Sequence, residues 1–130
     1  MVVGMPPGNF VYERRSSTLT DPIAAGTSGY RLLYWVKPSE AAIFLLYGLG
    51  TDQHLSSNYQ WVVDDVELPI SGVARVGTPQ EPYMFPEPVM ISSYVALYVS
   101  NSGTHAYPNA EIDDTDGEYP YECVIIGRYV

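Results

Sequence analysis

The stretch that decides the fold is NYQWVVDDVELPIS, residues 58–71. Apolar and polar side chains alternate on both sides of the dipeptide Asp64-Asp65, as in two strands that each bury one face. Folding the stretch about this dipeptide as a two-residue turn brings like residues together on each face. The apolar face pairs Val63 with Val66, Trp61 with Leu68 and Tyr59 with Ile70, and the other face pairs Val62 with Glu67, Gln60 with Pro69 and Asn58 with Ser71. The sequence therefore predicts an antiparallel hairpin with a half-buried face.

A proline-rich segment, PQEPYMFPEPVMI at residues 79–91, follows the hairpin. Its four prolines lack N–H donors and disfavour the helical conformation for the residues before them. We expect residues 78–88 to run extended, outside a regular sheet interior, as a stiff crossing from the sheet of the hairpin to another sheet. The alternating stretch VMISSYVALYVS, residues 89–100, is the strand that this crossing is expected to reach.

Two apolar segments precede the hairpin. YRLLYWV (30–36) and AAIFLLYGL (41–49) are apolar at both odd and even positions, which predicts two adjacent strands buried on both faces. Between them, Pro38 favours a turn and predicts a loose hairpin loop. A short helix over residues 40–47, with Ser39 as its N-cap and Gly48 at its end, is the alternative.

The remaining segments complete an all-β pattern. Residues 1–29 are dense in Gly, Pro, Ser and Thr, and we interpret them as an extended N-terminal arm. Residues 30–130 are expected to form a single domain, with a long polar connection over 101–120 and a last strand over 121–130. Six or more short strands separated by turn residues predict an antiparallel β-sandwich or a jelly-roll-like fold.

Composition argues against several classes of function. The net charge is −9, with only six Lys and Arg residues in 130. Such a surface repels phosphate backbones, so we expect no nucleic-acid partner. No apolar run reaches the length of a membrane span, and residues 1–29 lack the basic-then-apolar order of a secretory signal. The lone Cys123 cannot form an internal disulfide or a cysteine-rich metal site.

Residues that could carry catalysis are scattered over the chain. Cys123 precedes an apolar run without an activation motif and is expected to be a buried core thiol, while His54 and His105 lie in polar loops. Asp64 and Asp65 are adjacent on a turn and point apart, whereas glycosidase carboxyl groups face each other about 5–9.5 Å apart. We therefore expect no enzyme and no cofactor.

The acidic segment DDTDGE, residues 113–118, resembles part of a calcium-binding loop. Placing Gly117 at the sixth position of an EF-hand puts Ile112 first and Cys123 twelfth, and neither residue can serve there. A looser calcium-binding turn and a solvated acidic loop are the two alternatives.

Twelve tyrosines and two tryptophans could serve either sugar binding or the packing of a core or a subunit interface. Tyr94 and Tyr98 share one face of a predicted strand, and flat rings beside polar groups suit a sugar. Tyrosine is equally suited to sandwich cores and subunit interfaces, where its ring is buried and its hydroxyl stays paired.

The order of three segments resembles the small β-sandwich virion structural proteins, decoration or tail-associated, of tailed bacteriophages. The segments are YWVKPSEAAIFLLYGLG, NYQWVVDDVELP and PYMFPEPVMISSYVALYVSNSG. In that family a strand–V.P–strand unit is followed by a Y.W.VD hairpin, a proline-rich crossover and a strand ending in V.N. The likeness covers about residues 30–103, with VDD where VDG is more usual. It implies a non-enzymatic structural protein bound in many copies to a capsid or tail.

The resulting expectation is a capsid decoration protein or other outer-surface component of a virion, synthesised in the host cytoplasm. The negative charge favours the outer surface over a lining of the packaged genome. Expected partners are further copies of the chain and a major capsid or tail protein, without membrane or nucleic acid. The alternative function is a carbohydrate-binding module for host attachment, with a glycan as ligand. The residues expected to contact a partner are Phe10, Val11, Tyr12, Pro82, Tyr83, Phe85 and Pro86.

Overall fold

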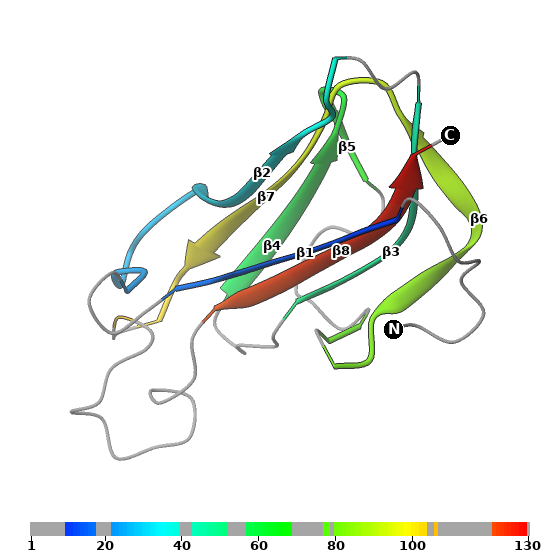
Figure 1. Ribbon diagram of the computed structural model, residues 1–130. Helices are drawn as coiled ribbons and strands as arrows, with labels where there is room; N and C mark the ends of the chain where they lie inside the picture. Colours follow the sequence, from blue (N-terminus) through cyan, green and yellow to red (C-terminus); the bar gives the residue numbers. More distant parts are fainter. Residues whose placement is uncertain are drawn as a thin grey trace.

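The computed structural model describes residues 10–17, 22–39, 43–51, 57–68, 77–78, 80–103, 106 and 121–129, with residues 10–12 described by their backbone (Figure 1). Within these ranges the chain forms strands and turns and no helix. The strands are β1 (Phe10–Ser16), β2 (Tyr30–Val36), β3 (Phe44–Thr51), β4 (Ser57–Val63), β5 (Val66–Glu67), β6 (Tyr83–Ile91), β7 (Tyr94–Asn101) and β8 (Glu122–Tyr129). They pair antiparallel in two four-stranded sheets, a first sheet β1-β8-β3-β6 and a second sheet β2-β7-β4-β5. The predicted antiparallel β-sandwich is confirmed.

The strand pairings are nested about the turn between β4 and β5. From this turn outward, β4 pairs with β5, β3 with β6, β2 with β7 and β1 with β8, and successive pairs lie alternately in the second and the first sheet. The chain is therefore one long antiparallel ribbon that winds around itself. Two further pairings, β4 with β7 and β3 with β8, join the pairs into sheets. Eight strands arranged in this way form a jelly roll.

The tip of the ribbon is the predicted turn at Asp64-Asp65. Both residues have left-handed φ angles, 49° and 68°, as the preferred two-residue hairpin turn requires. Val63 lies opposite Val66, and the Leu68 N–H donates to the Trp61 carbonyl at 2.8 Å. The predicted hairpin is thus confirmed as far as Leu68, and residues 69–71 lie outside the described ranges. One detail differs: Val66 is 65% exposed, because it lies in the edge strand β5, whereas Val63 opposite it is in a central strand and is buried.

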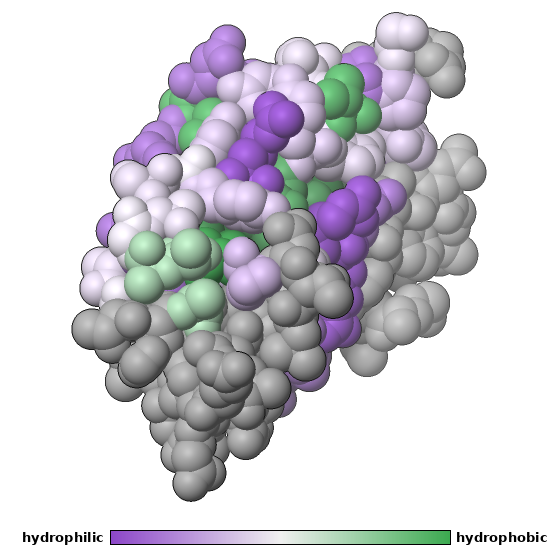
Figure 2. All heavy atoms as spheres, turned by 90° about the vertical axis from the view of Figure 1, so that its left-hand side faces the viewer, coloured by the Kyte–Doolittle hydropathy of each residue, from purple (hydrophilic) through white to green (hydrophobic). Residues whose placement is uncertain are grey.

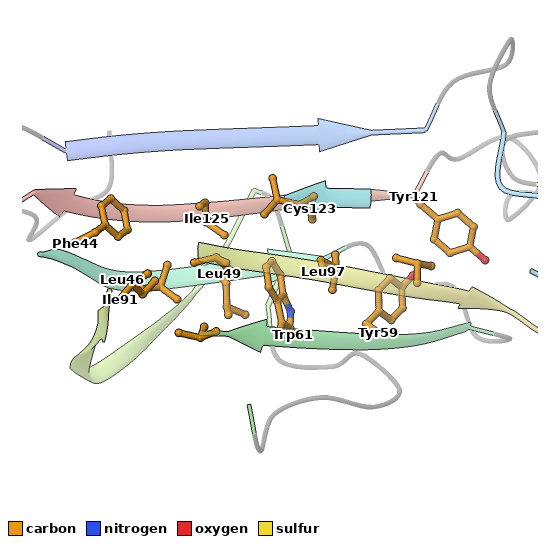
Figure 3. Packing of buried hydrophobic residues seen from close by; sticks show 14 of the residues in the cluster. Phe44, Leu46, Leu49, Tyr59, Trp61, Ile91, Leu97, Tyr121, Cys123 and Ile125 are labelled. Carbon is orange, nitrogen blue, oxygen red and sulfur yellow. The ribbon is translucent and has the colours of Figure 1, made fainter. Parts of the chain in front are cut away.

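The core lies between the two sheets and is built mainly from the central strands β3, β8, β4 and β7, together with Ile91 of the edge strand β6 (Figure 3). Full burial stabilises each such side chain by about 1.5–3 kcal/mol relative to exposure. The second sheet contributes Tyr59, Trp61, Val63, Val95, Leu97 and Val99, and the first sheet contributes Phe44, Leu46, Leu49, Ile91, Cys123 and Ile125.

The prediction that residues 30–36 and 41–49 form an adjacent pair of strands is wrong. β2 is an edge strand of the second sheet, whereas β3 is a central strand of the first. After β2, the Lys37 N–H donates to the Ser93 carbonyl at 2.8 Å, so the chain follows the β6–β7 corner instead of turning back. Residues 44–47 form a strand, so the helix alternative is also wrong for them. Residues 40–42 lie outside the described ranges.

Burial on both faces holds for β3 but not for β2. Every described position of β3 is buried or half-buried. In β2, by contrast, the side chains of Tyr34 and Val36 are 47% and 52% exposed, because this edge strand directs them to the outer face of the second sheet. The apolar residues of β2 therefore serve the surface as well as the core.

The proline-rich segment forms an irregular edge strand, and the expectation that residues 78–88 cross from one sheet to another is wrong. The Thr51 N–H of β3 already donates to the Gly77 carbonyl at 3.0 Å, and Tyr83–Ile91 is strand β6 of the first sheet. The connection from the hairpin to the first sheet includes residues 69–76, which lie outside the described ranges. The register with β3 breaks between Val89, which pairs with Leu46, and Met84, which pairs with Gly48, so residues 85–88 lie outside the regular ladder. The single strand predicted over 89–100 is wrong. Residues 92–93 separate β6 from β7 there, and the chain returns to the second sheet.

The interpretation of residues 1–29 as an arm needs correction for the residues that the structure describes. β1 pairs with β8 along its whole length, from Phe10 opposite Arg128 to Ser16 opposite Glu122. Ile23 is 1% exposed and belongs to the core. These segments complete the sandwich, because β8 would otherwise lie at an open sheet edge. Residues 1–9 and 18–21 lie outside the described ranges.

Asn101, at the end of β7, anchors the segment that follows β1. Its side-chain amide donates to the Ile23 carbonyl at 3.0 Å, and its own N–H donates to the Thr27 carbonyl at 2.8 Å. The Gly26 N–H in turn donates to the Asn101 carbonyl at 2.8 Å. Asn101 is fully buried, so these bonds satisfy groups that water cannot reach.

Trp61→Ala is expected to lower the free energy of unfolding by about 3–5 kcal/mol, the usual cost of removing a buried aromatic side chain. Gln60→Ala, on the exposed face of the same strand, is expected to change it by about 0.5 kcal/mol or less. Urea unfolding of both variants measures the difference. Equal effects would show that the two faces of β4 are assigned wrongly.

Deleting residues 1–17 is expected to lower the melting temperature substantially, because it removes β1 and leaves β8 unpaired at an edge. Calorimetry of the shortened chain beside the full chain measures this effect. An unchanged melting temperature would restore the interpretation of this segment as an arm.

Candidate interaction surfaces

The residues predicted to contact a partner lie at two opposite edges of the first sheet. Residues 10–12 are in β1, opposite residues 126–128 of β8. Tyr83, Phe85 and Pro86 are in β6, at the other edge, and Pro82 directly precedes it. The structure therefore does not gather the two groups into one patch.

The β6 edge presents both anchored and exposed side chains. The rings of Tyr83 and Phe85 meet edge to face, with centroids 5.4 Å apart, and Phe85 packs against the core. Pro86 is exposed, and Met90 is 59% exposed. Since Pro86 and Pro88 have no N–H, this edge is a poor template for strand addition. A partner would meet it through side chains.

The carboxylate of Asp64 holds the corner at which the chain passes from β6 to β7. One oxygen accepts the N–H groups of Ser93 at 2.7 Å and Tyr94 at 3.0 Å, and the other accepts the Ser92 N–H at 2.8 Å. Hydrogen bonds to a charged acceptor are about twice as strong as neutral ones. The tip of the ribbon is thereby fastened to the corner between the sheets.

The neighbouring carboxylate, Asp65, accepts a hydrogen bond from the Tyr94 phenol at 2.6 Å. This bond, together with a smaller contribution from desolvation, raises the pKa of Tyr94 above its usual value of 10.0. A raised pKa in the folded state means that the bond contributes stability below pH 10. The contribution is lost as the pH rises through the raised pKa.

Three tyrosines gather on the outer face of the second sheet, and we call this surface the tyrosine face. It comprises Tyr34 of β2 with Tyr94 and Tyr98 of β7, which alternate with the core residues of their strands. The ring centroids of Tyr34 and Tyr94 are 5.2 Å apart, and the guanidinium carbon of Arg31 lies 4.4 Å from the centroid of the Tyr34 ring. Such a stack is a cation–π contact.

Sequence reasoning identified Tyr94 and Tyr98 on this face but missed Tyr34 and Arg31. Their strand was assigned to a different pairing, so nothing placed it beside β7. The available signal was the apolar and aromatic character of β2 at both odd and even positions.

Other candidates from the sequence are placed as follows. Cys123 is a buried core thiol, as predicted. His54, His105 and residues 113–118 lie outside the described ranges. Among the residues that the structure describes, no group of three or more His, Cys, Asp or Glu side chains is placed to hold a metal ion. The same part of the chain contains no helix long and apolar enough to cross a membrane.

Comparison of the chain with known proteins finds no matching family model and no matching curated protein.

Asp64→Gly is expected to lower the free energy of unfolding by about 2–4 kcal/mol, because three N–H groups lose a charged acceptor. Asp65→Gly is the matched control. Glycine tolerates the left-handed φ at both positions, and only the Tyr94 bond is lost there. Its effect should stay within about 1 kcal/mol. Chemical denaturation compares the two, and a control as damaging as Asp64→Gly would contradict the corner's dependence on Asp64.

Proposed function

We propose that the protein is a non-enzymatic virion structural protein, a capsid decoration or other outer-surface component of a tailed phage that acts through subunit contacts. The observation that carries the proposal is a set of exposed apolar side chains around the corner held by Asp64. Val36, Val66 and Met90 are 52%, 65% and 59% exposed. Large apolar side chains that remain exposed after folding are candidates for contact with a partner.

The positions of these three side chains follow from the pairings around the corner. Val36 lies opposite Tyr94, the residue with which the corner ends. Val66 follows the turn whose Asp64 accepts the corner N–H groups, and Met90 lies in β6 just before the corner. All three therefore lie near one end of the sandwich, with Val36 in an edge strand of the second sheet and Met90 in an edge strand of the first.

Fold, sequence likeness and charge support the same proposal. Jelly rolls recur in viral capsid proteins and in lectins, although a fold alone does not define a function. The segments that resemble phage virion proteins contain strands β2 to β7, and Asn101 of the V.N ending donates a hydrogen bond to the Ile23 carbonyl. A net charge of −9 keeps free subunits soluble and suits a surface away from the packaged genome.

The proposal is tested on phage particles purified from a culture that carries the gene for this chain. Immunogold electron microscopy with an antibody against the purified protein should label the outer surface of tailed particles, in many copies each. A chain that is absent from particles, or that is accessible only after they are opened, would contradict the proposal.

A variant carrying Val36→Ser, Val66→Ser and Met90→Ser tests the contact surface itself. Quantitative mass spectrometry should find its copy number per particle reduced about tenfold or more, as expected when contacts worth at least about 1.4 kcal/mol are lost. Tyr30→Ser is the matched control, since Tyr30 is also exposed, at 37%, but lies at the other end of β2. Equal incorporation of the triple variant and the control would assign the contacts to another surface.

A further inference from the structure

The tyrosine face has a small residue at its centre. Ala96 lies between Tyr94 and Tyr98 along β7 and directly opposite Tyr34 of β2 and Val62 of β4. Its side chain is fully buried although it is on the outer face of the sheet. The larger neighbouring side chains therefore cover Ala96 and form the surface above it.

Hydrogen-bonding groups border the rings on both sides. Tyr98 lies between Arg31 of β2 and Gln60 of β4 in the register of the sheet. The Gln60 amide donates to the carboxylate of Glu67, which orients both groups on the exposed surface. Arg31 forms no ion pair with any residue that the structure describes, so its N–H groups can serve a ligand while its plane stays on Tyr34.

The arrangement matches the chemistry of a saccharide. A sugar ring has an apolar C–H side, which stacks on an aromatic ring, and a rim of hydroxyl groups that need donors and acceptors. Tyrosine supplies a rigid amphipathic surface at a low entropic cost. Tyr94 and Tyr98 are four residues apart in a strand, about 13 Å at 3.3 Å per residue, so the face suits an extended chain of sugars.

The charge of the protein narrows the class of glycan. The net charge is −9, and both Glu67 and Asp65 lie at the border of the face, so a polyanionic chain would be repelled. The side of the molecule on which β2 lies shows small apolar areas scattered among residues of intermediate and hydrophilic character (Figure 2). Such a mixed surface suits an uncharged amphipathic ligand.

We propose that the tyrosine face binds a neutral polysaccharide, with the ring of Tyr98 stacking on a sugar ring. Arg31, which the Tyr34 ring holds in place, and Gln60 bond to the hydroxyl groups. The site does not depend on the contact surface around the Asp64 corner. A protein bound to a particle and a free protein could both use this site. The result of the binding test is therefore independent of the result of the test of the proposed function.

The test is affinity electrophoresis of the purified full chain through gels containing one polymer each. The neutral probes are dextran, mannan, xyloglucan, arabinoxylan and galactan, and the acidic ones are alginate and polygalacturonate. At least one neutral polymer should retard the protein. Retardation by acidic polymers alone, or by no neutral polymer, would overturn the proposal.

Variants then locate the site. Tyr34→Ala and Tyr98→Ala should each weaken the retardation about tenfold, the loss of about 1.4 kcal/mol of binding. Tyr30→Ala is the matched control, an exposed tyrosine at the far end of β2 from the Asp64 corner, and should bind as the original chain does. Arg31→Ala, at an exposed position, provides a second test that spares the sheet and should also weaken binding. Binding unaffected by Tyr98→Ala and Arg31→Ala would contradict the assignment.

Discussion

The fold depends on one chain reversal and on the carboxylate that fastens it. At Asp64-Asp65 two consecutive residues hold left-handed φ angles, and every strand pairing along the ribbon is nested about this point. The Asp64 carboxylate then accepts three successive N–H groups from residues 92–94, where the chain crosses between sheets. No regular ladder can satisfy N–H groups at such a crossing. A single charged side chain therefore joins the tip of the ribbon to the corner of the sandwich.

Local features of the fold could be predicted from the sequence, whereas the pairing of its first strand with its last could not. Alternation around Asp64 is a property of neighbouring residues, so the hairpin and the buried position of Trp61 followed from period alone. The pairing of β1 with β8 joins residues more than a hundred positions apart. Nothing in the composition of residues 10–16 indicates that partner, and the Gly- and Pro-rich sequence around them resembled an arm.

The wrong burial prediction for β2 and the failure to predict Tyr34 and Arg31 on the tyrosine face have one cause. Apolar residues at both odd and even positions predicted burial on both faces, but in an edge strand the second face is the molecular surface. Tyr34 and Val36 are exposed for this reason. The two sheets thus differ in use: β3 and β8 of the first sheet are largely buried on both faces, while the second sheet presents rings and polar groups outward. The residues that misled the burial prediction are those to which we assign binding.

Amide hydrogen exchange at the β6–β7 corner tests the central claim most directly. Ser92 and Ser93 are exposed, so burial cannot protect their amides and only the bonds to Asp64 can. Exchange followed by NMR should be slowed at both residues and at Tyr94 to rates near those of the β7 ladder, and the slowing should disappear in Asp64→Gly. Exchange of Ser92 and Ser93 in the original protein at the rate of an unstructured turn would contradict the account.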